Sequence, residues 1–379
     1  MTRAGGRIGR HIPAWLAAFA LLVAGFAAPA APAPPAPAVV GTAPAPQAAA
    51  DVLPAPLAAA DTTPAPISGE ARAANASAEP ASAPSADCPP AAAPLTRDDV
   101  IAGMRDATDS GFLWRAARDG RTVYLYGTIH IAQRDWMFPG PHVLTALRES
   151  PEVALELDPT DPQIVARLQR AIGRKAGAPA LPRTLEARLA AQRATACVEP
   201  AEIAGLRPEM QAVTLEVMSG RRLGLQPAYG IDIFLAQLAR QMHKPLHSLE
   251  TPEAQAALLV SDDPRKTARN VEEVLEELES GNGPRILGRL ASAWRRGDLE
   301  ELASYEQWCE CLKTPEQRAD FVKLIDERNP LMAEHIVRLH EQGHALFVAV
   351  GSLHMVGPLG LPTLLRAKGF EVERVALGR

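Results

Sequence analysis

Two histidines stand in the same local sequence, each three residues after a glycine that ends an apolar run. His130 follows the run 122–126 through Gly127, and His354 follows the run 345–350 through Gly351. Short runs rich in β-branched and aromatic residues predict buried strands, and we expect each glycine to allow a sharp turn where its strand ends. Open α/β sheets bind their ligands beyond the carboxyl ends of their strands. The pair therefore predicts two imidazoles at one site, suited to metal binding or to proton transfer near neutral pH.

A carboxylate is the third candidate at this site. Glu156 lies in the apolar run 153–157, which predicts another strand. A buried carboxylate is costly unless it is paired or coordinated, so Glu156 is expected to be a metal ligand or a general base. Strand alternation leaves an exposed edge position as the alternative. Two imidazoles and one carboxylate suit Zn²⁺, Mn²⁺ or Co²⁺, with positions left open for water and substrate.

Four further residues could support this site. Asp232 follows Gly-Ile, and Glu250 lies between a short predicted strand and a predicted helix start. A carboxylate favoured by the helix dipole is the simpler interpretation of Glu250. Arg328 and Asn329 precede a proline after a helical stretch, so they either line the site or end a helix.

A second histidine pattern is present at residues 340–344, which read His-Glu-Gln-Gly-His. This matches the His-Glu-x-x-His pattern of zinc proteases, in which both histidines share one face of an intact helix. Gly343 is typical of a helix C-terminus, and a strong strand pattern follows at once. We therefore expect His344 to lie outside the helix, and the pattern to mark a helix end.

Strand patterns gather at the two ends of the globular part. Runs 112–116 and 122–127 predict a hairpin with an Asp-Gly turn, and runs 345–350 and 371–377 predict the last strands. Between them, residues 161–242 and 253–341 are mainly helical in pattern and are separated by a short strand at 243–249. The sequence predicts an α/β fold of α+β-like character, in which a central mixed sheet from both ends carries a large helical insertion.

The N-terminal part has two segments unlike the rest. Residues 1–30 combine arginines, an apolar stretch and small residues, which is typical of a secretory signal peptide. An uncleaved anchor is the alternative, although the stretch is short for a membrane span. Residues 31–94 are rich in Ala and Pro and predict a disordered tether, which leaves one domain at 95–379. We expect an exported protein, periplasmic or secreted, with no stable transmembrane segment after signal cleavage.

The charge of the chain narrows the classes of molecule that it could bind. The formal net charge is −5, and no basic cluster is present, which argues against nucleic-acid binding.

Four cysteines in an exported chain predict disulfides. Because Cys309 and Cys311 are so close in sequence, we expect Cys88 and Cys197 each to pair with one of them. A metal site at the Cys-x-Cys pair is the alternative.

These motifs together resemble the TraB/GumN family, which is related to the Tiki metalloproteases. The resemblance is carried by residues 126–130, 156–162, 230–251, 327–329 and 350–357. It implies a fold like that of the erythromycin-esterase and ChaN-type proteins and, from the Tiki branch, a Mn²⁺- or Co²⁺-dependent peptidase. His130, Glu156 and His354 would form the centre.

The expected function is that of an exported metal-dependent hydrolase, a peptidase acting on a peptide or protein substrate. A metal on the two histidines and Glu156 would activate water, and Arg328 would stabilise the developing oxyanion. One alternative is a metal-independent, esterase-like hydrolase. The other is a non-catalytic protein that binds a peptide or signal in the same pocket. The oligomeric state is not predicted.

Overall fold

The computed structural model describes residues 88–378. The expected signal peptide and most of the expected tether lie outside these residues. Residues 88–94 have no helix or strand and run along the domain. There, Ala93 donates its backbone N–H to the Tyr229 hydroxyl at 3.0 Å, and Arg221 donates to the Pro89 carbonyl at 2.9 Å. No helix among residues 88–378 is both long and apolar enough to cross a membrane.

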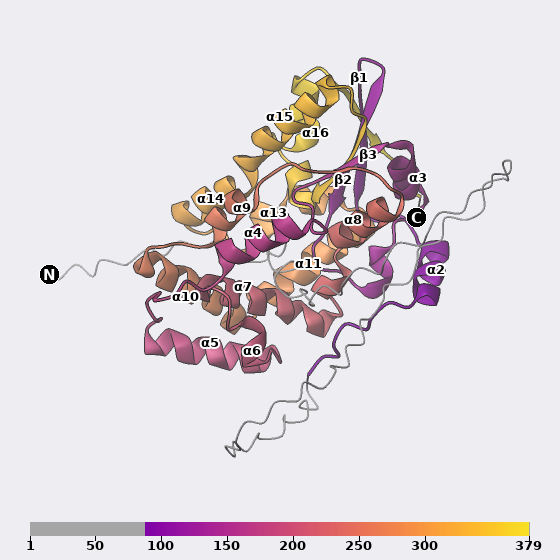
Figure 1. Cartoon of the computed structure of the whole chain (residues 1–379). Helices are drawn as coiled ribbons and strands as arrows, with labels where there is room; N and C mark the ends of the chain where they lie inside the picture. The colour runs from indigo at the N-terminus through magenta and orange to yellow at the C-terminus, as the bar shows by residue number, and fades with distance from the viewer. Residues whose placement is uncertain (1–87, 379) are drawn as a thin grey trace, which may run out of the picture.

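A mixed six-stranded sheet forms the centre of the molecule, with the strand order β4-β3-β5-β2-β1-β6 (Figure 1). β4, β3, β5 and β2 are parallel, whereas β1 runs antiparallel to both of its neighbours. As predicted, most strands come from the two ends of the domain, and the short β4 lies between the two helical stretches. Their bounds are Phe112–Arg118 (β1), Arg121–Thr128 (β2), Glu152–Leu155 (β3), Leu246–Ser248 (β4), Leu346–Gly351 (β5) and Glu371–Val375 (β6).

Helices cover both faces of the sheet because the parallel connections cross over with one hand. The connections β2–α3–β3 and β3–α8–β4 run in one direction along the sheet, and β5–α16–β6 runs in the other. α3 and α8 therefore pack on one face, and α16 packs on the other face together with α15. The bounds are Pro141–Glu149 (α3), Ile231–Gln241 (α8), Arg328–Glu341 (α15) and Leu361–Ala367 (α16).

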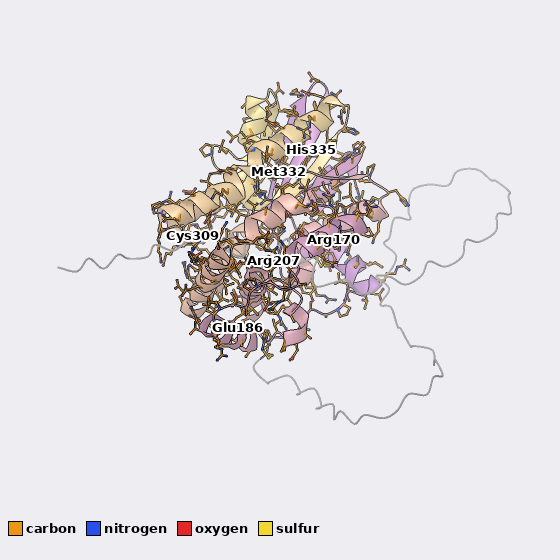
Figure 2. All side chains as sticks on the ribbon, turned by 60° about the vertical axis from the view of Figure 1, so that its left-hand side comes forward. Arg170, Glu186, Arg207, Cys309, Met332 and His335 are labelled. Carbon is orange, nitrogen blue, oxygen red and sulfur yellow. A yellow bond between two sulfur atoms is a disulfide. The ribbon has the colours of Figure 1, made fainter. Side chains whose placement is uncertain are left out.

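The remaining helices form the predicted insertion, and α5, α6, α7 and α10 gather away from the sheet (Figure 1). Their bounds are Arg183–Thr195 (α5), Pro200–Ile203 (α6), Pro208–Ser219 (α7) and Pro264–Ser280 (α10). Others lie nearer the sheet or precede it: Arg97–Asp106 (α2), Pro162–Ile172 (α4), Pro252–Leu259 (α9), Asn282–Arg296 (α11), Leu299–Ala303 (α12), Tyr305–Trp308 (α13) and Pro315–Phe321 (α14). Side chains fill the space between these layers (Figure 2). At the start of α7, the largely buried Arg207 donates to Oδ1 of the exposed Asp262 at 2.8 Å.

The direction of the chain across the sheet reverses between β2 and β5. From β2 the chain passes over β5 to β3, and from β5 it crosses back past β2 and β1 to β6. In open α/β sheets such a reversal leaves a crevice beyond the carboxyl ends of the strands, where ligands bind. The segments that follow β2, β3 and β5 all meet at this position.

The disulfide pairing expected from the sequence is wrong. Cys88 bonds to Cys197, and Cys309 bonds to Cys311. The expectation failed because it assumed ordinary backbone between Cys309 and Cys311. Instead Glu310 adopts the left-handed conformation, with φ of 57°, and the two cysteine Cα atoms come within 5.1 Å. Neither cysteine is then a thiolate free to bind a metal, so the Cys-x-Cys metal site is also excluded.

Candidate active site

The two Gly-x-x-His segments meet, as predicted, on one carboxylate. β2 and β5 are adjacent and parallel, with Thr128 paired to Gly351, so the segments that follow them leave the same sheet edge. His130 Nε2 lies 4.0 Å from Glu156 Oε1, and His354 Nε2 lies 3.9 Å from the same oxygen. Glu156 itself directly follows β3, the other neighbour of β5.

Each imidazole is fixed by a polar partner at its other nitrogen. Asp232, in the first turn of α8, has its Oδ1 3.0 Å from His130 Nδ1. Asn329, in the first turn of α15, has its Oδ1 2.6 Å from His354 Nδ1. When Nδ1–H donates to these oxygens, each Nε2 keeps its lone pair and faces Glu156. A ligand histidine in a metal site is normally oriented in this way.

Glu156 is buried rather than exposed at an edge, since only 4% of its surface is accessible. Its Oε1 accepts a hydrogen bond from the backbone N–H of Gly351 at 2.8 Å, and its Oε2 accepts one from Arg328 Nη2 at 2.6 Å. Gln255 donates to the same Oε2 at 3.2 Å and to Glu250 Oε2 at 2.9 Å. The carboxylate therefore has one oxygen held by Arg328 and the other turned toward the histidines.

Arg328 joins two buried carboxylates. Its Nε donates to Glu250 Oε1 at 2.8 Å, its Nη2 contacts both Glu156 and Glu250, and its Nη1 donates to the Leu324 carbonyl at 3.0 Å. Leu324 lies in a π-helical turn, Val322–Asp326, immediately before α15. With every nitrogen of the guanidinium engaged by the protein, Arg328 is placed to hold Glu156.

α15 is anchored so that Arg328 and Asn329 reach the site. Met332 is fully buried one turn further along, and His335 Nδ1 lies 3.1 Å from the Leu249 carbonyl (Figure 2). Leu249 follows β4 and precedes Glu250, so α15 is fixed to the segment that supplies the partner of Arg328.

The surroundings shift the pKa values of the three central groups in different directions. Burial would raise the pKa of Glu156, but the charge of Arg328, followed by the two histidines, holds it at about 2. Burial and the charge of Arg328 lower the pKa of His354 to about 3. Burial also acts to lower the pKa of His130, yet the charge and hydrogen bond of Asp232 raise it overall. The site thus keeps Glu156 ionised and His354 neutral, and it favours positive charge at His130.

The two glycines at the strand ends differ in what a side chain there would contact. Neither Gly127 nor Gly351 has a positive φ, so no sharp left-handed turn requires them. A Cβ at Gly127 would lie 3.0 Å from Ser352 Oγ, which is tight, whereas a Cβ at Gly351 would make ordinary contacts, 3.4 Å from Glu156 Oε1 and 3.6 Å from His130 Nε2. Gly351 therefore keeps open the position toward which the histidines and Glu156 point.

A largely apolar pocket opens over this centre, with about 680 Å³ of free space including its mouth. Polar groups lie on its floor, and the apolar walls come from the insertion and the segment after β5: Leu287, Leu290, Ala291, Leu302, Ile325 and Leu353. Trp294 also lines the pocket and donates its indole N–H to the Gly127 carbonyl at 2.8 Å. Such a pocket can hold an apolar side chain beside the polar floor.

Sequence reasoning missed Gln255 and the pocket walls. Gln255 lies in α9, where nothing in the local pattern separates it from other polar helix residues. Trp294 is the one pocket residue that the sequence weakly indicated, because it is a large aromatic residue on the apolar face of α11. Of the residues expected at the site, five line the pocket, namely His130, Glu156, Arg328, Gly351 and His354. Asp232, Glu250 and Asn329 each contact one of these five.

The donor set at this centre fits a divalent cation. The three carboxylates of Glu156, Glu250 and Asp232 face one positive charge on Arg328, which leaves a formal charge of −2 when both histidines are neutral. Two nitrogens and one oxygen suit Zn²⁺, Mn²⁺ or Co²⁺. Ligands of one such ion lie roughly 3–3.5 Å apart. Here Glu156 Oε1 lies 3.9–4.0 Å from the two imidazoles, and the donor atoms of the three residues do not all lie within 4.8 Å of one another, so the histidines would have to move toward each other to hold an ion.

The His-Glu-x-x-His pattern marks a helix end, as predicted. α15 ends at Glu341, and His340 is fully buried with its ring 4.8 Å from that of Phe370. His344 lies beyond the helix and contacts Glu152 instead. The two histidines therefore do not share a helix face, and this pattern does not form a zinc-protease site.

Comparison with known proteins points to one family. The model of the TraB/PrgY/gumN family matches residues 112–374. "Metalloprotease TIKI1" of Danio rerio is 26% identical over 317 residues, which cover 71% of this chain and 64% of that protein. "Uncharacterized protein YbaP" of Escherichia coli (strain K12) is 29% identical over 160 residues, covering 41% of this chain and 54% of that protein. The chain thus spans less than two thirds of the length of these curated relatives. No solved structure matches, so the likeness to erythromycin-esterase and ChaN-type folds stays a prediction.

Proposed function

The chain belongs to the TraB/PrgY/gumN family, and from that membership we propose that it is an exported, metal-dependent hydrolase that cleaves peptide bonds. One observation carries the proposal. Two imidazoles with their Nδ1 atoms held by Asp232 and Asn329 both direct Nε2 at one oxygen of the buried Glu156. The relationship to a protein named as a metalloprotease supports the reaction class. The two disulfides and the signal-like N-terminus support export.

His130, His354 and Glu156 would hold the ion. A divalent cation bound there supplies Lewis-acid polarisation of a carbonyl and a bound water of lowered pKa. Arg328 keeps Glu156 ionised and fixed, which suits a ligand better than a general base. His130, backed by Asp232, is the group in this site whose pKa is raised, so it is the place where a proton is held most readily when no ion is bound.

The pocket indicates the kind of substrate. Its apolar walls lie directly over the polar floor, so a peptide with an apolar side chain beside the scissile bond would bury that side chain against Leu287, Leu290 and Leu353. We therefore propose preferential cleavage next to apolar residues. A charged side chain at this position would lose its hydration without gaining a partner.

The test is cleavage of a mixed peptide library by purified protein produced from the full-length precursor. Mn²⁺, Co²⁺ or Zn²⁺ is supplied in turn, beside a chelator control, His130→Ala, and His243→Asn as a matched change of an exposed histidine. We expect cleavage beside apolar residues that is lost with His130→Ala and with the chelator, is restored by adding metal back, and is kept in His243→Asn.

Two outcomes would overturn the proposal in different ways. Cleavage that resists chelators but is lost in His130→Ala would indicate a metal-independent hydrolase, with His130 and Asp232 as its base. A folded protein that cleaves nothing with any of the three metals would indicate the non-catalytic peptide-binding role.

A further inference from the structure

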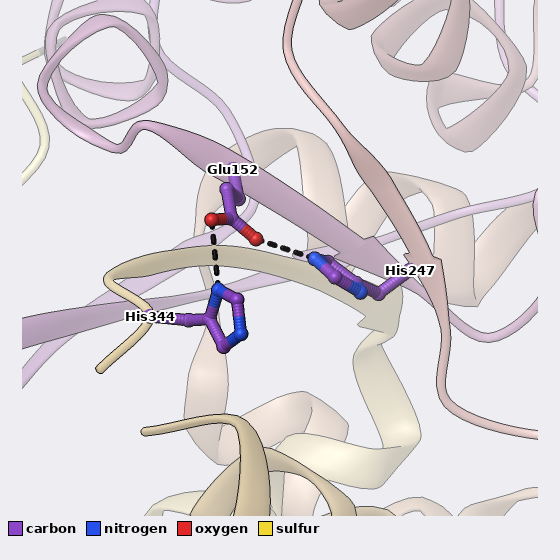
Figure 3. A group of neighbouring side chains, drawn as sticks. All are labelled: Glu152, His247 and His344. Carbon is purple, nitrogen blue, oxygen red and sulfur yellow. Dashed lines mark hydrogen bonds and ion pairs between the residues drawn. The ribbon is translucent and has the colours of Figure 1, made fainter. Parts of the chain in front are cut away.

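A second His–Glu cluster lies outside the candidate active site (Figure 3). Glu152 stands between two histidines, with His247 Nε2 2.5 Å from its Oε2 and His344 Nδ1 2.8 Å from its Oε1. The two imidazole rings are 5.5 Å apart and meet edge to face. Among residues 88–378, this is the group of three whose donor atoms all lie within 4.8 Å of one another.

Strand pairing brings the three residues together from distant parts of the sequence. Glu152 begins β3 and pairs with Leu346 at the start of β5, two residues after His344. His247 lies on β4 opposite Ala154, two residues along β3 and hence on the same face as Glu152. The cluster therefore spans three adjacent strands near the amino ends of β3 and β5. Glu156 follows the opposite end of β3, so the two sites are separate.

The cluster has both donors and access for an ion. The side chains of Glu152, His247 and His344 are 19%, 26% and 31% exposed, so an ion from solvent can reach them and water can complete its coordination. Burial acts to raise the pKa of Glu152, but the hydrogen bonds of the two histidines lower it overall, which keeps the carboxylate ionised. Two imidazole nitrogens and a carboxylate oxygen are ligands that Zn²⁺ and its neighbours in the first transition series prefer.

We propose that Glu152, His247 and His344 form a second metal site, which binds one divalent transition-metal ion of the Zn²⁺ type. The ion takes the place of the two N–H···O hydrogen bonds. For neutral imidazoles, the proton on His247 moves from Nε2 to Nδ1 and that on His344 moves from Nδ1 to Nε2, so ion binding releases no net proton. Bound there, the ion links β4, β3 and β5 and stabilises this edge of the sheet. The proposal does not depend on the proposed function.

The experiment isolates this site in a His130→Ala background of the whole protein. Zn²⁺ is titrated calorimetrically, and Co²⁺ is followed by its visible absorption. We expect about one equivalent of tight binding, weakened at least tenfold by Glu152→Gln, His247→Asn or His344→Asn. His243→Asn is the matched control, because His243 is exposed close to β4 and asparagine tolerates its left-handed backbone. The control should bind as the background does.

Unchanged Zn²⁺ binding in Glu152→Gln and His344→Asn would overturn the proposal, as would the absence of any Zn²⁺ binding in the folded His130→Ala protein. Should the ligand variants fold poorly, chemical protection gives the answer on the unaltered chain. Zn²⁺ should slow modification of His247 and His344 by diethyl pyrocarbonate and leave His243 unaffected, and equal rates with and without Zn²⁺ would overturn the proposal. Peptide cleavage is expected to persist in His344→Asn, so a failure here is distinguishable from a failure of the proposed function.

Discussion

The two His–Glu clusters lie at opposite ends of β3, and they differ in how much of the protein is built around them. At Glu156, each histidine has a partner on its second nitrogen, and the carboxylate is held by Arg328, Gln255 and a backbone N–H. At Glu152, the carboxylate is paired with two histidines whose rings also meet edge to face, and all three side chains reach solvent. The first arrangement is typical of a site that must hold its geometry during a reaction. The second is sufficient to bind an ion.

The largest expected effect is a difference in unfolding free energy between variants of the two clusters, because the Glu156 cluster contains more buried charge. Arg328→Met would leave Glu156 and Glu250 buried next to each other without a counter-ion, and we expect a loss of about 3–5 kcal/mol of unfolding free energy. Glu152→Gln, in the more exposed cluster, should cost less than about 1 kcal/mol without metal. Urea unfolding of both variants checks this. Equal losses would mean that the two clusters do not differ as described.

Gly351→Ala should lower the proposed peptide turnover without lowering the stability of the fold. The new Cβ would make ordinary contacts with Glu156, His130 and His354 at 3.4–3.7 Å, and φ of −51° suits alanine. It would nevertheless occupy the position toward which the ligands point, so we expect a loss in turnover of roughly 100-fold. The melting temperature and peptide turnover are measured together. Full activity would show that this position is not used.

Asp232→Asn tests whether the partner of His130 Nδ1 matters for the function of the Glu156 cluster. We expect metal affinity or turnover to fall by about 10-fold or more. Because the charge of Asp232 raises the pKa of His130, this variant should also lower that pKa. NMR titration of the His130 ring in metal-free protein gives the value. A pKa equal to that of the unaltered protein would contradict the role assigned to Asp232.

The smallest predicted effect is the contribution of His354 to the pH dependence of the unfolding free energy. Its folded-state pKa is about 3, whereas an unfolded histidine titrates near about 6.5. Below pH 6.5 the unfolded chain therefore binds a proton that the folded chain does not, and stability falls as the pH decreases. The contribution is at most about 1.4 kcal/mol per pH unit between pH 6 and 4.5. His354→Gln should remove it, and unfolding curves with identical slopes would refute the assignment.

Much of the fold and of the first cluster could be predicted because the relevant signals are local. The apolar runs, the Asp-Gly turn and the glycines before His130 and His354 indicate strands and strand ends. β3 is one exception in detail, since it ends at Leu155 and leaves Glu156 just beyond the strand. Even the helix end at 340–344 follows from a single glycine and the strand after it.

The second cluster could not be predicted, because no local pattern connects its members. His247 and Glu152 come together only through the pairing of β3 with β4, and His344 comes in through β5. The pairing of the cysteines could not be predicted from the sequence either. Their pairing depends on the left-handed conformation of Glu310 and on the path of residues 88–94 over the domain, neither of which sequence spacing specifies.

The bond between Cys88 and Cys197 also determines how the domain would carry a mechanical load. A pull applied at Cys88 passes through the disulfide into Cys197, two residues after α5, rather than along residues 89–96 into α2. α5 belongs to the helices that gather away from the sheet. The force would therefore enter the domain through the helical insertion and not through α2 and the strand β1 that follows it.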